Sequence, residues 1–149
     1  MKNIYIGCDH GGFELKNTII ERLLSLGYEV FDAGTYTNES CNYPVYAKEV
    51  CRNVLENEGS LGILVCGTGI GMSIAANKIK GIRAAHCTDT FSAKMTRRHN
   101  NANVLCLGAR ITGSDLALDI VDDFLANEFE GGRHATRVEM LSEIEKENA

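Results

Sequence analysis

The hydrophobic positions along the chain fall into short continuous runs that alternate with longer segments of helical spacing. The runs predict five buried parallel strands, at residues 3–8, 28–32, 61–65, 82–87 and 104–107. The longer segments repeat apolar side chains at intervals of three and four residues, which predicts helices. Alternating strands and helices favour an α/β fold, a three-layer α/β/α sandwich with a Rossmann-like five-stranded parallel sheet. We expect one domain spanning residues 1–149.

The most informative segment is residues 61–78, where an apolar run leads into a glycine-rich turn and then a helix. The turn carries Cys66 and then three glycines, Gly67, Gly69 and Gly71. From Ile70 onward, apolar residues recur at helical spacing. Glycines let backbone N–H groups approach a ligand closely, and a helix N-terminus adds free donors and a positive dipole end. The segment therefore predicts an anion-binding turn.

Cys66 has two interpretations at this point. A thiolate is stabilised beside a helix N-terminus, so Cys66 is placed to act as a base or nucleophile facing an oxyanion. A cysteine at the end of a strand also commonly packs as a small buried hydrophobe. The turn itself does not close with the Gly-Lys-Ser/Thr of a phosphate-binding loop. Its glycine spacing also lacks the two-residue gap of a dinucleotide fingerprint, although Asp89 lies near the spacing of a ribose-binding acid.

Polar residues follow several of the predicted strands. Ligands of parallel sheets bind outside the carboxyl ends of the strands. The first strand delivers Asp9 and His10 to that edge, and the fifth leads to Arg110. The helix after the fourth strand instead ends at His99 and Asn100, at the opposite edge. These two residues would serve the same site only if another subunit supplied them, which indicates a shared dimer site.

The segment 131–137 contains a second candidate site. Arg133 and Arg137 are four residues apart and share a face over the first turn of a helix. Cations at a helix N-terminus oppose the dipole unless an anion binds there, so the pair predicts a phosphate clamp. The alternative is a solvated basic turn in which the arginines pair with Glu130 and Glu139.

The histidines also have ordinary structural interpretations. His86 lies within an apolar strand, where we expect a core histidine whose hydrogen bonds are satisfied. His99 would suit a helix C-terminus, and His10 would suit the cap of the first helix.

Composition narrows the class of protein. The chain has 149 residues, 44% of them hydrophobic and 23% charged, as in an ordinary globular protein. A net charge of −5 argues against a surface that coats nucleic acid. No apolar window is long enough for a membrane span, and no signal peptide is expected. Its six cysteines show no metal-ligand spacing, and together these features predict a cytoplasmic protein without membrane or nucleic-acid partners.

Four motifs together resemble the ribose-5-phosphate isomerase B family, which also contains allose-6-phosphate and galactose-6-phosphate isomerases. They are residues 8–13 (CDHGGF), 66–71 (CGTGIG), 98–100 (RHN), and 131–134 (GGRH) with Arg137. The similarity extends over essentially the whole chain.

The resemblance implies an aldose–ketose isomerase that interconverts D-ribose 5-phosphate and D-ribulose 5-phosphate through an enediolate, in the pentose phosphate pathway. It also implies a homodimer or dimer of dimers with shared sites, and no metal or cofactor. A hexose 6-phosphate, allose 6-phosphate above all, is the alternative substrate. A flavin- or nucleotide-binding module without chemistry is a different class, and the absence of tryptophan counts against it.

Residue roles also follow from the resemblance. Cys66 is the expected base that moves a proton between C1 and C2, with Thr68 assisting. His99 of the neighbouring subunit is the expected acid–base catalyst of ring opening. The expected substrate-binding residues are Asp9, His10, Gly67, Thr68, Gly69, Ile70, Gly71, Asn100, Arg110, Arg133 and Arg137.

Overall fold

The five predicted strands pair in parallel into one sheet. A computed structural model describes all residues, 1–149. The strands are β1 (Asn3–Cys8), β2 (Glu29–Asp32), β3 (Leu61–Cys66), β4 (Ala84–His86) and β5 (Val104–Gly108), and their order in the sheet is β2-β1-β3-β5-β4. The helices are α1 (Phe13–Ser25), α2 (Tyr43–Glu56), α3 (Ile70–Asn77), α4 (Thr90–Asn100), α5 (Ser114–Leu125) and α6 (Arg133–Glu147). The predicted three-layer α/β/α fold is confirmed, with β4 shorter than its apolar run.

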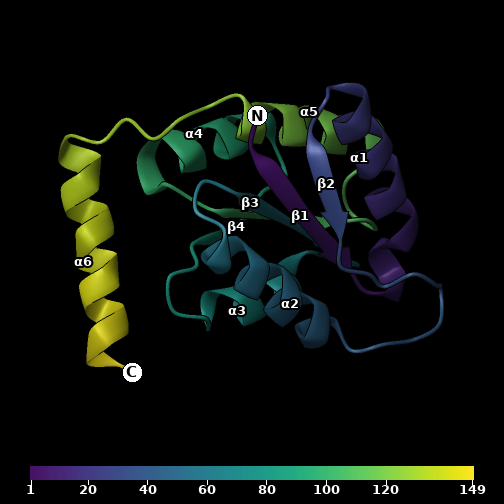
Figure 1. Cartoon of the computed structure of the whole chain (residues 1–149), viewed down its shortest axis with the longest axis horizontal. Coiled ribbons are helices and arrows are strands. Elements are labelled where there is room, and N and C mark those ends of the chain that lie inside the picture. The colour runs from purple at the N-terminus through teal and green to yellow at the C-terminus, as the bar shows by residue number, and fades with distance from the viewer.

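Five of the helices cover the two faces of the sheet. Figure 1 shows α1, α4 and α5 on one face and α2 and α3 on the other, whereas α6 extends away from the sheet at the end of the chain. A short 3₁₀ turn, His10–Gly12, leads from β1 into α1. No helix of the chain has both the length and the apolar character that a membrane crossing requires.

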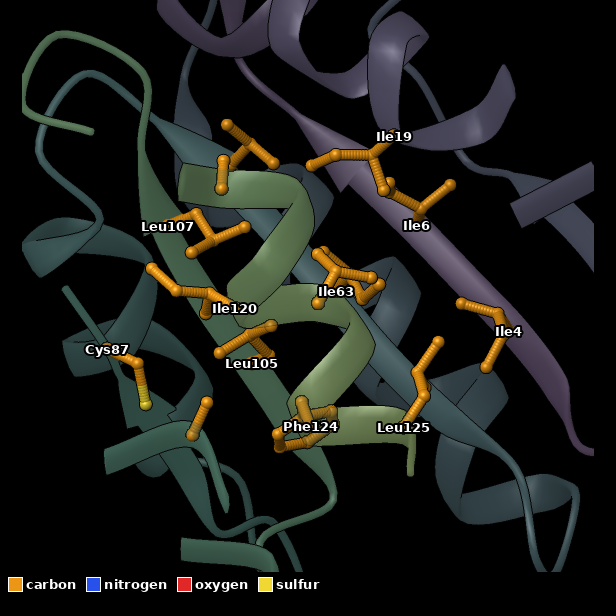
Figure 2. Packing of buried hydrophobic residues seen from close by; sticks show 14 of the residues in the cluster. Ile4, Ile6, Ile19, Ile63, Cys87, Leu105, Leu107, Ile120, Phe124 and Leu125 are labelled. Carbon is orange, nitrogen blue, oxygen red and sulfur yellow. The ribbon is translucent and has the colours of Figure 1, made fainter. Parts of the chain in front are cut away.

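Side chains alternate along the central strands between two hydrophobic clusters. Ile63 and Val65 of β3 pack with Ile19 of α1 and with Ile120 and Phe124 of α5, as Figure 2 illustrates for most of these residues. The intervening strand residues, among them Leu64 and Cys66, face α2 and α3. Each central strand is buried on both sides, which explains why its sequence is continuously apolar.

The apolar residues of α3 are distributed differently from what their spacing indicates. Met72 and Ala76 form the buried face of this helix. Ile70 and Ile74 are 48% and 56% exposed, although their spacing also suits a buried face. The helix itself is confirmed, and its outer surface is apolar.

A buried lysine ties the segment after β2 to α1. Lys16 has no exposed surface, and its ammonium lies 2.7 Å from Oδ1 of Asp32 and 2.6 Å from the carbonyl oxygen of Thr35. The carboxylate and the carbonyl together compensate for the burial of the charge. This contact places the loop of residues 33–42 over the carboxyl end of β1.

Candidate active site

The glycine turn wraps around the thiol of Cys66 at the carboxyl end of β3. The N–H of Gly69 donates to Sγ of Cys66 over 3.1 Å. Gly69 has a left-handed backbone, with φ of 80°, and is the N-cap of α3. The turn is anchored to the end of β5 because the amides of Ala109 and Arg110 donate to the carbonyls of Cys66 and Gly67, each over 2.9 Å.

Backbone donors lie free beside the thiol. The amides of Gly67 and Thr68 make no hydrogen bond within the chain. Thr68 is exposed, and its hydroxyl accepts from the N–H of Ile70 over 3.3 Å. A thiol next to unpaired amides at the start of a helix has the arrangement of a base beside an oxyanion site.

Asp9 and His10 follow the neighbouring strand, β1, at the same carboxyl end of the sheet. β1 and β3 are adjacent. The chain continues from β1 to β2 on one side of the sheet and from β3 to β4 on the other side, so these two strands form the switch point at which such sheets bind ligands. Asp9 is buried, and its Oδ1 accepts from the N–H of Gly11 over 2.9 Å. Nδ1 of His10 accepts from the N–H of Cys41 over 3.2 Å. Asp9 thus caps the 3₁₀ turn, whereas the loop of residues 33–42 orients His10.

Arg110 adds a positive charge to this edge. A side chain on Gly67 would meet Nη1 of Arg110 at 3.1 Å, so the guanidinium lies directly against the glycine turn. His10, Gly11 and Arg110 line one cleft of about 560 Å³, together with Ser114 at the start of α5. The cleft combines a cation with a helix N-terminus, which favours an anionic group.

The remaining candidates form a second group at the far end of the molecule. His99 and Asn100 end α4, and Arg133 and Arg137 lie on the first turns of α6. The carbonyl of Asn103 accepts from Gly62 at the start of β3, so the end of α4 lies at the amino edge of the sheet. Cys66 is at the other end of that strand, about 13–16 Å away along β3. One chain therefore does not bring His99 to Cys66.

Neither arginine of the second group has an ion-pair partner in the chain. Arg133 and Arg137 are exposed, and Glu130, the partner of the alternative interpretation, pairs with Arg98 instead. α6 begins at Gly132 without a side-chain cap and without an acidic residue in its first turn. A helix start that is basic and uncapped favours the phosphate clamp over a basic turn whose arginines pair with nearby glutamates.

Two residues near these groups carry polar atoms that sequence reasoning did not assign to the site. Tyr43, the first residue of α2, lies across Gly71, where an added side chain would meet the phenol ring at 2.8 Å. The sequence does carry a signal for Tyr43: this tyrosine follows a polar loop and directly precedes a proline that starts a helix. His86 differs from its expected satisfied state, because its buried Nε2 has no hydrogen-bond partner. The ring lies against Gly69, where an added side chain would meet its Cδ2 at 2.8 Å.

His99, Glu130 and His134 form a group of three side chains that carry potential metal ligands. Their ligand atoms lie within 4.8 Å of one another. The two imidazole rings are nearly parallel, with an interplanar angle of 9° and centroids 4.1 Å apart. The in-plane lone pairs of parallel stacked rings do not converge on one ion. The arrangement is better suited to sharing a proton than to holding a metal.

Comparisons with known proteins show what the chain is similar to. The model of the ribose/galactose isomerase family matches residues 4–141. Ribose-5-phosphate isomerase B of Escherichia coli (strain K12) is 50% identical over 146 residues, which cover 98% of each chain. The structure of Clostridium thermocellum ribose-5-phosphate isomerase B is 56% identical, covers both chains completely and superposes with a TM-score of 0.97. That of the Mycoplasma genitalium enzyme with bound ribulose-5-phosphate is 44% identical over 97% of each chain, with a TM-score of 0.93.

Proposed function

The chain belongs to the ribose/galactose isomerase family, and from that premise we propose that it interconverts D-ribose 5-phosphate and D-ribulose 5-phosphate. One observation carries the proposal. The thiol of Cys66 lies 3.1 Å from the amide of Gly69, beside the free amides of the glycine turn and next to Asp9. Aldose–ketose isomerisation needs a base next to an oxyanion site, and this cluster supplies both.

Cys66 is the base of the proposed proton transfer. The thiolate takes the proton from C2 of the open-chain aldose, and the electron pair moves to form the C1–C2 double bond of the enediolate. The backbone of the segment from Gly67 to Gly71, with its free amides at Gly67 and Thr68, holds the oxyanion on O1, and the Thr68 side chain assists. The proton then returns from the thiol to C1, and the O2 hydroxyl passes its proton to O1, so that O2 becomes the carbonyl oxygen and O1 a hydroxyl. Reactant and product have the same composition, so no redox partner is needed.

Ring opening requires a separate acid–base group, and His99 is the proposed one. An imidazole removes the proton of the O1 hydroxyl and returns one to the ring oxygen as the bond from C1 to that oxygen breaks. Asp9, His10 and Asn100 are the proposed partners of the sugar hydroxyls. The exposed guanidinium groups of Arg110, Arg133 and Arg137 are the proposed partners of the phosphate. Binding energy from the phosphate then helps to orient the reacting carbons.

This division of labour requires a second copy of the chain, and we propose a homodimer, alone or paired into a dimer of dimers. The support is that His99 and Cys66 lie at opposite edges of the same sheet. α6 also projects from the body of the molecule (Figure 1) and exposes Met140, Leu141 and Ile144. An exposed apolar helix face is typical of an interface.

The test is turnover of ribose 5-phosphate with reductant and EDTA present, comparing the wild type with Cys66→Ser. We expect the variant to fold and to lose about 100-fold or more in kcat, because a serine hydroxyl stays protonated near neutral pH and supplies no anion to replace the thiolate. Cys51→Ala, which removes a fully buried thiol in α2, is the matched control and should retain activity. Wild-type turnover in Cys66→Ser would remove Cys66 from the mechanism. Wild type that is inactive on ribose 5-phosphate but active on allose 6-phosphate would move the proposal to hexose phosphates.

A further inference from the structure

Glu130 is the centre of a polar cluster that joins three separate parts of the chain. Its Oε2 accepts from Nε of Arg98 over 2.5 Å, and its backbone N–H donates to the carbonyl of Arg98 over 3.0 Å. Its other oxygen, Oε1, lies 3.8 Å from Nε2 of His99 and 3.6 Å from Nε2 of His134. The carboxylate is therefore held from both its side chain and its backbone, and it faces two imidazoles.

The two imidazoles are stacked on each other. Their centroids are 4.1 Å apart and their planes differ by 9°. His134 is buried on the first turn of α6, whereas the side chain of His99 is 38% exposed. His134 thus forms a fixed floor for the His99 ring, and the edge of that ring remains accessible.

The charges in the cluster allow for one mobile proton. The hydrogen bond from Arg98 lowers the pKa of Glu130, so the carboxyl group stays ionised near neutral pH. Desolvation and the charge of His99, followed by Arg133 and Arg137, lower the pKa of His134, which keeps that ring neutral. A single imidazolium beside Glu130 is compensated by the carboxylate, whereas two would repel each other.

We propose that Glu130 is a positioning residue for His99: it holds the imidazole against His134 and stabilises its protonated form during ring opening. The inference rests on the proposed function, because it gives His99 the ring-opening role. In that step His99 accepts the proton of the O1 hydroxyl and delivers a proton to the ring oxygen. Between the two transfers the ring is an imidazolium, and the ionised carboxylate lowers the free energy of that state.

The experiment separates ring opening from proton abstraction. Ribose 5-phosphate is largely cyclic, whereas ribulose 5-phosphate cannot form a furanose because its 5-oxygen carries the phosphate. Exchange of the C1 protons of ribulose 5-phosphate in D₂O, followed by NMR, reports enediolate formation without ring opening. Turnover of ribose 5-phosphate requires both steps.

We expect Glu130→Gln to lower kcat for ribose 5-phosphate by about tenfold or more, with KM changed less than about twofold. Deuterium exchange into ribulose 5-phosphate should stay within about twofold of the wild type. Glu128→Gln is the matched control, since Glu128 lies on the same segment but pairs with Lys2. This control should leave both measurements unchanged.

Three results would overturn the inference. They are undiminished ribose 5-phosphate turnover in Glu130→Gln, equal losses in turnover and exchange, and a loss confined to KM. Equal losses would indicate that Glu130 supports the whole site. Thermal unfolding of Glu130→Gln near the wild-type temperature is the control for folding. Glu130→Asp, which keeps the charge, should recover part of the turnover of ribose 5-phosphate. Failure of the wild type in both assays would instead reject the proposed function.

Discussion

At the scale of single residues, Gly69 and Gly59 provide a matched pair of left-handed backbones. Their φ angles are 80° and 82°, and this region is costly for any residue with a side chain. The two surroundings differ. A Cβ on Gly69 would meet His86 and the backbone carbon of Leu107 at 2.8 Å, whereas one on Gly59 would meet nothing within 4 Å. Of these two glycines, only Gly69 therefore combines an unusual φ with close packing.

We expect Gly59→Ala to cost about 1 kcal/mol of stability through its φ alone, with isomerase activity retained. Gly69→Ala should cost more and should also move the amide that donates to Cys66, so activity falls by about tenfold or more. Urea unfolding and ribose 5-phosphate turnover of both variants check this. Equal effects in the two variants would show that the contacts around Gly69 do not matter.

At the scale of elements, the loop of residues 33–42 depends on a residue from another element. Lys16 belongs to α1, yet its ammonium binds the end of β2 and the carbonyl of Thr35. The same loop brings the amide of Cys41 to His10. Orientation of a proposed substrate-binding residue thus depends on a buried charge in α1.

We expect Lys16→Met to lower the free energy of unfolding by about 2–4 kcal/mol, because Asp32 and the carbonyl of Thr35 lose their buried partner. KM for ribose 5-phosphate should rise as the support of His10 loosens. Lys48→Met, at an exposed position of α2 without an ion pair, should change stability by less than about 0.5 kcal/mol. Chemical denaturation and steady-state kinetics measure both effects. A loss of stability with unchanged KM would show that Lys16 does not support the orientation of His10.

At the scale of the whole molecule, a site shared between subunits predicts complementation. Cys66→Ser and His99→Asn should each be inactive alone. Chains of the two variants that assemble at random should regain about a quarter of wild-type activity, because half of the dimers are mixed and one of their two sites is intact. Co-expression with two different affinity tags allows the mixed species to be isolated and assayed. A mixed dimer without activity would contradict the shared site.

The buried thiols predict how stability depends on alkaline pH. Burial raises the pKa of Cys8 and Cys87 to about 11 and that of Cys51 to about 12, from an ordinary value of 9.0. Above pH 9 the unfolded chain loses these protons and the folded chain keeps them, so the free energy of unfolding falls as pH rises. The stabilisation is complete below pH 9 and disappears as the pH passes the folded-state values.

We expect each such thiol to contribute a decline of up to about 1.4 kcal/mol per pH unit in that range. Tyrosine and lysine side chains titrate there too, so the informative quantity is the difference from Cys51→Ala, whose decline should be shallower by about 1 kcal/mol per pH unit. Urea unfolding between pH 8 and 10.5, with reductant present, measures both slopes. Parallel slopes would mean that Cys51 does not contribute.

Sequence alone determined the sheet, the glycine turn and the family, because each depends on local pattern. Continuous apolar runs specify strands buried on both faces, and the glycines around Cys66 specify a turn that opens a helix. The residues within each motif lie close together in the chain, so the motifs can be recognised without knowing the tertiary contacts. The separation of His99 from Cys66 was also predictable, since a helix after a parallel strand returns to the opposite edge.

Only the tertiary structure decided how distant residues meet. The burial of Lys16, the unpartnered Nε2 of His86 and the exposure of Ile74 depend on which elements pack together, and periodicity does not specify that. The cluster around Glu130 joins the end of α4 to the start of α6, so its contacts exist only after both helices are placed. Hydrophobic spacing indicates which faces of an element are apolar, but not which of these faces another element covers. Polar contacts between elements depend on side-chain geometry, which the spacing does not contain.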